Sequence, residues 1–79
     1  MEIQVRMYGT LGKELPGHDS LKGITLDLQE GLSVGDLIDR LEIPRKKVGI
    51  ISVGGGLAKD TRILQEGDFV RLYRPIFGG

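Results

Sequence analysis

Two glycines, Gly78 and Gly79, end the sequence and are the residues whose chemistry is easiest to predict. Neither has a Cβ atom, so the pair can pass through a narrow channel and adopt backbone angles that other residues avoid. A C-terminal carboxylate is a poor electrophile, but adenylation would turn it into an acyl group with a good leaving group. Glycines also leave that carbonyl uncrowded. The pattern predicts a carrier whose C-terminal carboxylate is activated.

The residues before these glycines predict how that carboxylate is presented. A strand expected at 69–73 is followed by Pro75, which cannot donate to a sheet ladder and stiffens an extended path. Residues 74–79 would reach roughly 20 Å if extended. We expect a domain over residues 1–73 and a flexible tail over 74–79. The tail residues expected to contact partners are Arg74, Pro75, Ile76 and Phe77. The alternative is a frayed end without function, since small residues are common at chain ends.

Length and composition limit the classes of function. The chain has 79 residues, 39% of them hydrophobic and 28% charged, which favours one globular domain over disorder. Eleven basic and eleven acidic residues give no net charge, so neither nucleic acid nor a membrane is an expected partner. We find no apolar run of transmembrane length and no signal-peptide pattern, so we expect a cytoplasmic protein.

Few residues could act as an enzyme's catalytic groups. The absence of cysteine excludes disulfides, thiolate metal sites and cysteine nucleophiles. The single histidine, His18, lies among Gly, Pro and Asp residues, which favours a solvated loop over a catalytic base or metal ligand. Glycines 54–56 fit neither phosphate-binding spacing and predict a tight turn. We therefore expect no metal site, no stably bound cofactor and no catalysis by this chain alone.

Apolar spacing predicts the strands. Alternation of apolar and polar residues indicates strands at 2–8, 24–29 and 69–73, the first two forming a hairpin. An apolar, β-branched run at 48–53 predicts a central strand. Residues 57–64 are expected to be irregular, with Ile63 and Leu64 entering the core. A single helical turn is possible at 10–15.

The period changes between residues 33 and 44. Apolar residues at Val34, Leu37, Ile38 and Leu41 form one stripe of a helix, and Ser33 is a suitable N-cap. Pro44 should close this helix through its effect on the preceding residue. The basic run 45–47 that follows is expected to be a solvated loop. One main helix covering one face of a mixed sheet of four to five strands predicts an α+β fold. First and last strands adjacent and parallel at the sheet centre would complete a ubiquitin-like β-grasp, a placement that follows from topology and not from the periodicity.

Three aromatic residues fall on the outward positions of the first and last strands. Tyr8 alternates with the apolar residues of its strand, as Phe69 and Tyr73 do with those of theirs. If the strands are neighbours, these rings could form an exposed patch at the base of the tail, and such patches mark partner sites. The alternative is that they are ordinary exposed aromatics.

The combination of these segments resembles the ubiquitin-like sulfur-carrier family, which includes the small subunit of molybdopterin synthase and the carrier for thiamine thiazole synthesis. The likeness covers essentially the whole chain. It rests on residues 3–9 (IQVRMYG) with Leu11 and Leu15, on 30–38 (EGLSVGDLI), on 64–70 (LQEGDFV) and on 75–79 (PIFGG). The length and the Gly-Gly end are more similar to those of the molybdopterin synthase small subunit than to those of the shorter thiazole carrier.

The resemblance implies a chemical cycle and two kinds of partner. An adenylating enzyme would use ATP and magnesium to activate Gly79, and sulfur transfer would then give a thiocarboxylate. The tail would enter a second partner, such as a synthase large subunit, and donate sulfur there. Family partners dock on a hydrophobic sheet patch whose matching positions are Tyr8, Leu57 and Tyr73. The chain would then be the small, sulfur-donating subunit of a synthase.

Three alternatives stay open at this point. The same activated terminus could instead be conjugated to lysines, as in a ubiquitin-like protein modifier. The sulfur could serve thiamine thiazole synthesis or another thiolation pathway. The chain could also be a plain β-grasp interaction module whose tail is incidental.

Overall fold

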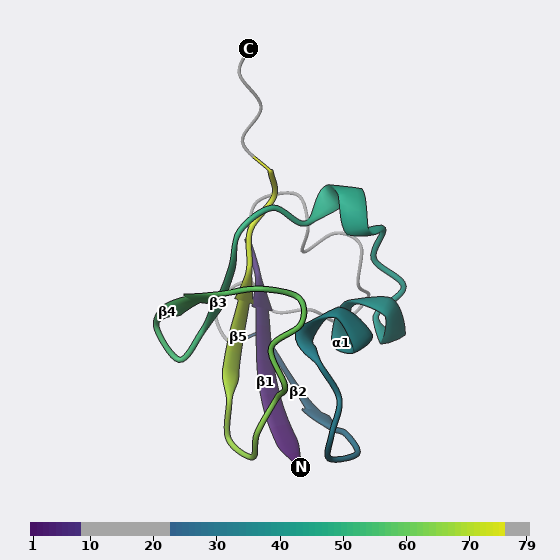
Figure 1. Cartoon of the computed structure of the whole chain (residues 1–79), viewed down its shortest axis with the longest axis vertical. Helices are drawn as coiled ribbons and strands as arrows, with labels where there is room; N and C mark the ends of the chain where they lie inside the picture. The colour runs from purple at the N-terminus through teal and green to yellow at the C-terminus, as the bar shows by residue number, and fades with distance from the viewer. Residues whose placement is uncertain (9–22, 76–79) are drawn as a thin grey trace.

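Seven elements follow one another in residues 1–8 and 23–75, the part of the chain that the computed structural model describes (Figure 1). They are β1 (Glu2–Met7), β2 (Ile24–Asp27), α1 (Val34–Arg40), the short 3-10 helix η2 (Arg45–Lys47), β3 (Ile51–Val53), β4 (Gly56–Ala58) and β5 (Phe69–Leu72). The strands form one mixed sheet in the order β2-β1-β5-β3-β4. The predicted α+β, β-grasp fold is confirmed, with five strands.

The first and last strands lie side by side within the sheet and run in the same direction (Figure 1). Val5 is opposite Val70, and Met7 is opposite Leu72. β2 pairs antiparallel with β1, and β3 pairs antiparallel with β5, so the expected hairpin and the expected parallel pair are both present. Because β1 and β5 are parallel neighbours, their C-terminal ends lie next to each other at the same end of the sheet.

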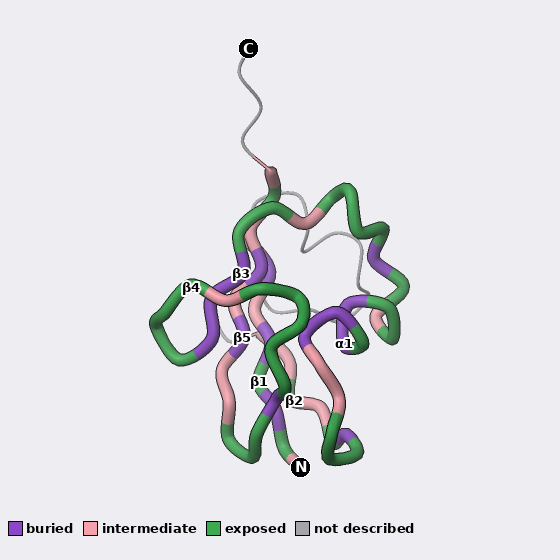
Figure 2. The backbone as a smooth tube through the Cα atoms, viewed as in Figure 1, coloured by how far each residue is buried: buried purple, intermediate pink, exposed green. Residues whose placement is uncertain are grey.

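The core lies between one face of this sheet and α1 (Figure 2). Alternate residues of the two central strands are buried there, as the pleat requires. From the helix, Leu37 and Ile38 are almost completely buried. The buried hydrophobic residues are Ile3, Val5, Met7, Leu28, Val34, Leu37, Ile38, Ile43, Ile51, Val53, Leu64, Val70 and Leu72.

The start of α1 is fixed by a reciprocal pair of hydrogen bonds. The Asp36 backbone N–H donates to Ser33 Oγ over 3.1 Å, and the Ser33 backbone N–H donates to Asp36 Oδ2 over 2.9 Å. This capping box satisfies N–H groups that the first helical turn leaves unpaired, and it confirms Ser33 as the N-cap. The helix ends earlier than predicted, at Arg40, because Glu42 takes up a left-handed conformation with φ of 59° before Pro44 is reached.

The prediction for residues 48–64 was wrong in two respects. Only Ile51–Val53 of the apolar run pair as a strand, although this strand, β3, lies inside the sheet between β5 and β4 as predicted. Leu57 and Ala58, expected to be irregular, form the edge strand β4 against β3 together with Gly56, which was expected in the turn. Gly54 and Gly55 have φ of 60° and 90°, and two successive residues of positive φ make the tight turn that joins antiparallel strands.

The expectation that Ile63 and Leu64 both enter the core was half wrong. Leu64 is 2% exposed, whereas Ile63 is 52% exposed. The segment is extended here, with Ile63 bridged to Ser33 and the Leu64 N–H donating to the Leu32 carbonyl. Successive side chains of extended backbone point to opposite sides, so only one of the two can face the core. The possible helical turn at 10–15 and His18 lie outside the described residues.

Two negative findings apply to residues 1–8 and 23–75. No helix in these ranges is long and apolar enough to cross a membrane. No group of three or more His, Cys, Asp or Glu residues in them is placed to hold a metal ion.

Candidate docking face and the base of the tail

Tyr8 and Tyr73 meet where the two central strands end. The Tyr8 N–H donates to the Leu72 carbonyl over 3.0 Å, which continues the parallel ladder by one residue beyond β1. The two rings are stacked, with centroids 4.5 Å apart and planes 13° from parallel. Both tyrosines are half-buried. Of the three aromatic residues that the sequence placed on outward positions, Tyr8 and Tyr73 are therefore in direct contact.

Phe69 lies on the same outer face but at the opposite end of β5. It is opposite Gln4, whereas the tyrosines lie beyond the other end of the paired register. A row with Arg6 opposite Arg71 separates them. The Arg71 guanidinium lies 4.4 Å from the centroid of Phe69, and that of Arg6 lies 4.8 Å from the centroid of Tyr8. The outer face is thus aromatic at both ends of β5 and cationic between them.

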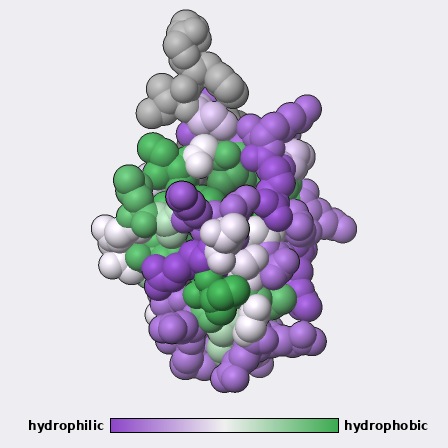
Figure 3. All heavy atoms as spheres, viewed as in Figure 1, coloured by the Kyte–Doolittle hydropathy of each residue, from purple (hydrophilic) through white to green (hydrophobic). Residues whose placement is uncertain are grey.

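Two aliphatic side chains extend the aromatic pair toward the edge of the sheet. Leu57 on β4 is opposite Ser52 and is 82% exposed. Ile50, which precedes β3, is 45% exposed, and its backbone carbonyl accepts a hydrogen bond from the Tyr73 N–H over 3.0 Å. Figure 3 shows hydrophobic atoms gathered on the β3–β4 side of the molecule, below the base of the tail. We call Tyr8, Ile50, Leu57 and Tyr73 the docking patch.

Ile50 was not among the residues singled out from the sequence. The predicted run 48–53 placed it in a strand, but the partner of that strand was not known. Once β3 is registered against β5 with Ile51 opposite Leu72, the preceding residue falls beside Tyr73. The sequence therefore showed that Ile50 is apolar, but its place beside Tyr73 could be found only from the pairing of β3 with β5.

The base of the tail is held against the segment before β3. The Gly49 N–H donates to the Tyr73 carbonyl over 2.7 Å. A Cβ atom at residue 49 would lie 2.6 Å from Pro75 Cα and 2.8 Å from Pro75 N, so only glycine fits beside this part of the chain. Arg74 is exposed, and Pro75 is half-buried. The remaining predicted site residues, Ile76, Phe77, Gly78 and Gly79, lie outside the described residues.

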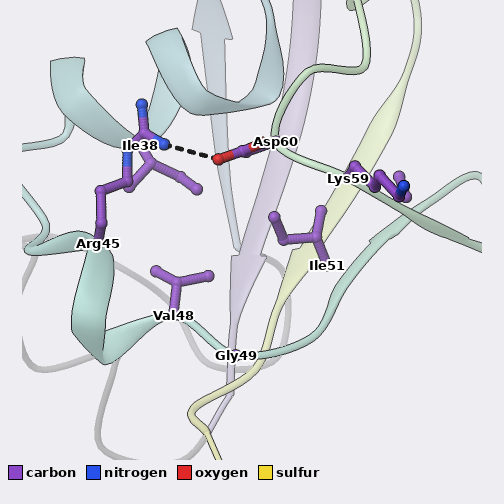
Figure 4. A pocket seen from close by; sticks show the side chains of 8 residues that line it. Ile38, Arg45, Val48, Gly49, Ile51, Lys59 and Asp60 are labelled. Carbon is purple, nitrogen blue, oxygen red and sulfur yellow. Dashed lines mark hydrogen bonds and ion pairs between the residues drawn. The ribbon is translucent and has the colours of Figure 1, made fainter.

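A separate hollow of about 360 Å³ lies on the other side of β3, between α1, η2 and the end of β4 (Figure 4). Arg45 forms part of its polar lining. The basic run 45–47, expected to be a solvated loop, is exposed but forms the 3-10 helix η2. Arg45 donates to Asp39 at 2.9 and 3.0 Å and to Asp60 at 3.0 Å. The hydrogen bond from Arg45 lowers the pKa of Asp39 below its ordinary value. Because its guanidinium is already bound to two carboxylates, Arg45 is a poor anchor for an anionic ligand. The hollow is lined by Ile38, Arg45, Val48, Gly49, Ile51, Ala58, Lys59 and Asp60.

The arrangement of strands, patch and tail base can be compared with known proteins. The family described as Mut7-C ubiquitin matches residues 1–78. The chain belongs to the Mut7-C ubiquitin family. No curated protein matches the sequence significantly.

Solved structures similar to this Mut7-C ubiquitin chain have low sequence identity but cover almost all of it. Small archaeal modifier protein 1 from Haloferax volcanii is 15% identical, covers 95% of this chain and 98% of its own, and superposes with a TM-score of 0.71. Urm1 from Trypanosoma brucei is 16% identical, with coverages of 99% and 95% and a TM-score of 0.71. A chain from the complex of subunits 1 and 2 of molybdopterin-converting factor from Helicobacter pylori is 20% identical, with full coverage of both and a TM-score of 0.62.

These matches confirm that the Mut7-C ubiquitin chain has the fold of the ubiquitin-like carriers that its sequence resembles. At identities of this size the likeness establishes the fold. The chemistry has to be argued from this chain's own residues.

Proposed function

We propose that this protein is a cytoplasmic sulfur carrier whose C-terminal Gly79 is adenylated and converted to a thiocarboxylate. The observation that carries the proposal is the position of the docking patch. Parallel pairing of β1 and β5 brings Tyr8 and Tyr73 together at the end of the sheet from which residues 74–79 continue. A partner that binds this patch would hold residues 74–79 within reach of its own active site.

The proposed chemistry needs little from the fold itself. The Gly79 carboxylate attacks the α-phosphorus of ATP bound with magnesium in the activating enzyme, and pyrophosphate leaves. Sulfide (HS⁻) then attacks the acyl-adenylate carbonyl and displaces AMP, which leaves a thiocarboxylate on the chain and releases one proton. Glycine at positions 78 and 79 keeps the attacked carbonyl uncrowded. ATP and magnesium belong to the activating partner, and this chain supplies the carboxylate and the docking patch.

The acceptor we favour is a synthase large subunit in molybdopterin biosynthesis. The Helicobacter pylori structure is a complex of subunits 1 and 2 of molybdopterin-converting factor, and this chain superposes on a chain of that complex over its full length. The exposed Leu57 and Ile50 beside the two tyrosines give an apolar surface of the kind that forms the centre of stable interfaces. The carrier would act there as the small, sulfur-donating subunit.

The proposal is tested by reconstitution with an alkylating probe. The chain is incubated with its cognate activating enzyme, magnesium-ATP and a sulfide donor, and is then treated with iodoacetamide. Because the sequence contains no cysteine, a thiol-directed adduct that maps to residues 76–79 reports a carried sulfur. We expect one adduct per chain that requires ATP and disappears when Gly78 and Gly79 are deleted. An adduct that persists without ATP, or none with an active enzyme, would contradict the proposal.

A second candidate function is conjugation to lysines. Small archaeal modifier protein 1 has the same fold and is named as a modifier. The two functions diverge after activation, because a lysine amine rather than a sulfur nucleophile would attack the acyl group. Isopeptide-linked adducts of this chain in its own cells, lost when Gly78 and Gly79 are deleted, would favour the modifier.

A further inference from the structure

One arginine joins three segments that are separate in the sequence. Arg45 Nε and Nη2 donate to the two carboxylate oxygens of Asp39 in α1, at 2.9 and 3.0 Å. Arg45 Nη1 donates to Asp60, which follows β4, at 3.0 Å (Figure 4). We call Arg45, Asp39 and Asp60 the clasp. Two parallel N–H donors on one carboxylate fix the orientation of a guanidinium, so the clasp defines where Arg45 lies relative to α1 and to the segment after β4.

The first turn of α1 leaves room for this guanidinium. The Gly35 N–H donates to the Asp60 carbonyl over 2.8 Å, so backbone also joins the helix start to the segment after β4. A Cβ atom at residue 35 would lie 2.7 Å from Arg45 Nη2 and 3.1 Å from Arg45 Cζ. Glycine within a helix is less stable than alanine by about 1 kcal/mol. The glycine at this position therefore has a physical reason, which is the space that Arg45 occupies.

Arg45 is also the first residue of η2, the turn that leads to the base of the tail. None of the three residues of η2 is buried, so packing in the core does not fix the position of this turn. The Val48 N–H donates to the Arg45 carbonyl over 3.1 Å, and Gly49 follows directly. The clasp therefore attaches an exposed turn to α1, only four residues before Gly49.

Gly49 is the residue against which the chain leaves the sheet. Its N–H donates to the Tyr73 carbonyl over 2.7 Å. A Cβ atom on it would lie 2.6 Å from Pro75 Cα, so the two segments of backbone are in direct contact. A displacement of η2 would therefore move the residue that contacts Pro75.

We infer that Arg45 is a positioning residue for residues 74–79, because the clasp holds η2, η2 places Gly49, and Gly49 sets the path of the chain at Pro75. None of the hydrogen bonds of the clasp involves a residue of the docking patch. Opening the clasp should therefore affect delivery of the tail more than docking. The consequence for sulfur loading rests on the proposed function, whereas the consequence for Gly49 does not.

The clasp can be opened in two independent ways in the full chain. Arg45→Gln removes the charge and the fork, and Arg45→Lys keeps the charge without the fork. Gly35→Ala keeps Arg45 but displaces its guanidinium, and it raises the helix propensity of α1, so it separates the clasp from helix stability. Arg40→Gln is the matched control, because Arg40 is an exposed arginine in the last turn of α1. Circular dichroism and urea denaturation check that each variant is folded.

The first measurement is amide hydrogen exchange by NMR. We expect the Gly49 N–H to exchange roughly tenfold faster in Arg45→Gln and in Gly35→Ala, less so in Arg45→Lys, and at the wild-type rate in Arg40→Gln. The Tyr8 N–H, which donates to the Leu72 carbonyl beside the central strands, is the internal reference and should keep its rate. Unchanged exchange at Gly49 would overturn the inference. Equal acceleration at Gly49 and Tyr8 would also overturn it, because the clasp would then stabilise the whole fold and not the base of the tail.

The second measurement is the rate at which the ATP-dependent iodoacetamide adduct forms on residues 76–79, together with calorimetric binding to the activating enzyme. We expect loading to fall roughly fivefold or more in Arg45→Gln and Gly35→Ala while the affinity stays close to that of the wild type. Wild-type loading in a variant whose Gly49 exchanges faster would overturn the positioning role and leave the proposed function intact. A wild-type chain that forms no ATP-dependent adduct would instead contradict the proposed function, and the exchange measurement would still decide whether the clasp places Gly49.

Discussion

Tyr8 and Tyr73 stack with their ring centroids 4.5 Å apart, although 64 residues separate them in the sequence. The contact exists because the first and last strands of the β-grasp sheet are parallel neighbours. It fixes one side of the docking patch and the start of the tail at the same time. The two tyrosines therefore link the stability of the fold to the surface that a partner would recognise.

The tyrosine stack should be measurable as a coupling energy. In a double-mutant cycle with Tyr8→Ala and Tyr73→Ala, we expect the two losses of unfolding free energy to fall short of additivity by about 0.5–1.5 kcal/mol. Urea denaturation of the four proteins gives this value. The pair Tyr8→Ala and Leu57→Ala serves as a control, because no ring contact joins these two positions. Fully additive tyrosine losses would show that the rings do not stabilise each other.

Leu57 offers a way to separate binding from folding. Its side chain is 82% exposed, so Leu57→Asp should change the unfolding free energy by no more than about 0.5 kcal/mol. The same variant should bind the activating enzyme at least tenfold more weakly, because it places a charge within the docking patch. Ile63→Asp is the matched control, since Ile63 is also exposed but is bridged to the N-cap of α1, away from the patch. If the two substitutions weakened binding equally, the docking patch would not be the surface that the activating enzyme recognises.

Gly49 should matter for the direction in which the chain leaves the sheet. A Cβ atom there would meet Pro75 Cα at 2.6 Å, so Gly49→Ala must move backbone and should cost about 1–3 kcal/mol of stability. Sulfur loading on Gly79 should fall more than enzyme binding does, because the added Cβ atom clashes with Arg74 and Pro75 at the start of the tail and none of its nearest contacts is a residue of the docking patch. Gly56→Ala is the control, since its nearest neighbour would be 4.0 Å away. Unchanged loading in Gly49→Ala would show that tail direction is not set here.

The capping box predicts a dependence of stability on pH. The hydrogen bond from the backbone N–H of Ser33, and then that with its hydroxyl, lower the pKa of Asp36 below its ordinary value of 3.8. A lowered folded-state pKa stabilises the protein above the unfolded value, and this contribution is lost as the pH falls through the folded-state pKa. The stability difference between the wild type and Asp36→Asn should therefore be largest near neutral pH and shrink below 3.8. A difference that stays constant from about pH 6 to about pH 2 would contradict this assignment.

The sequence predicts correctly the elements whose apolar residues recur with a clear period. It fails where the structure of a segment depends on which strand the segment pairs with. The stripe through Leu37 and Ile38 and the N-cap at Ser33 were predicted because they depend on neighbours three or four residues away. β4 was missed because a three-residue strand has no period of its own and exists only through its pairing with β3. Ile63 was misplaced for a related reason, since its exposure is decided by the bridge to Ser33.

The same division holds for the candidate site. Tyr8, Phe69 and Tyr73 could be assigned to outward positions from alternation alone, but their contacts depend on which strands are neighbours. Neither the stack nor the arginine row that separates Phe69 from the tyrosines has a signal in local sequence. The close approach of Gly49 to Pro75 likewise joins segments that are distant in the chain.

The carried sulfur on Gly79 can be detected directly by measuring the mass of the C-terminal peptide of the protein isolated from its own cells. We expect a fraction of peptides that end at Gly79 with one oxygen replaced by one sulfur, and this fraction should disappear when the activating enzyme is deleted. Peptides that continue beyond Gly79, or that end there only as an ordinary carboxylate while the pathway is active, would contradict the proposed function.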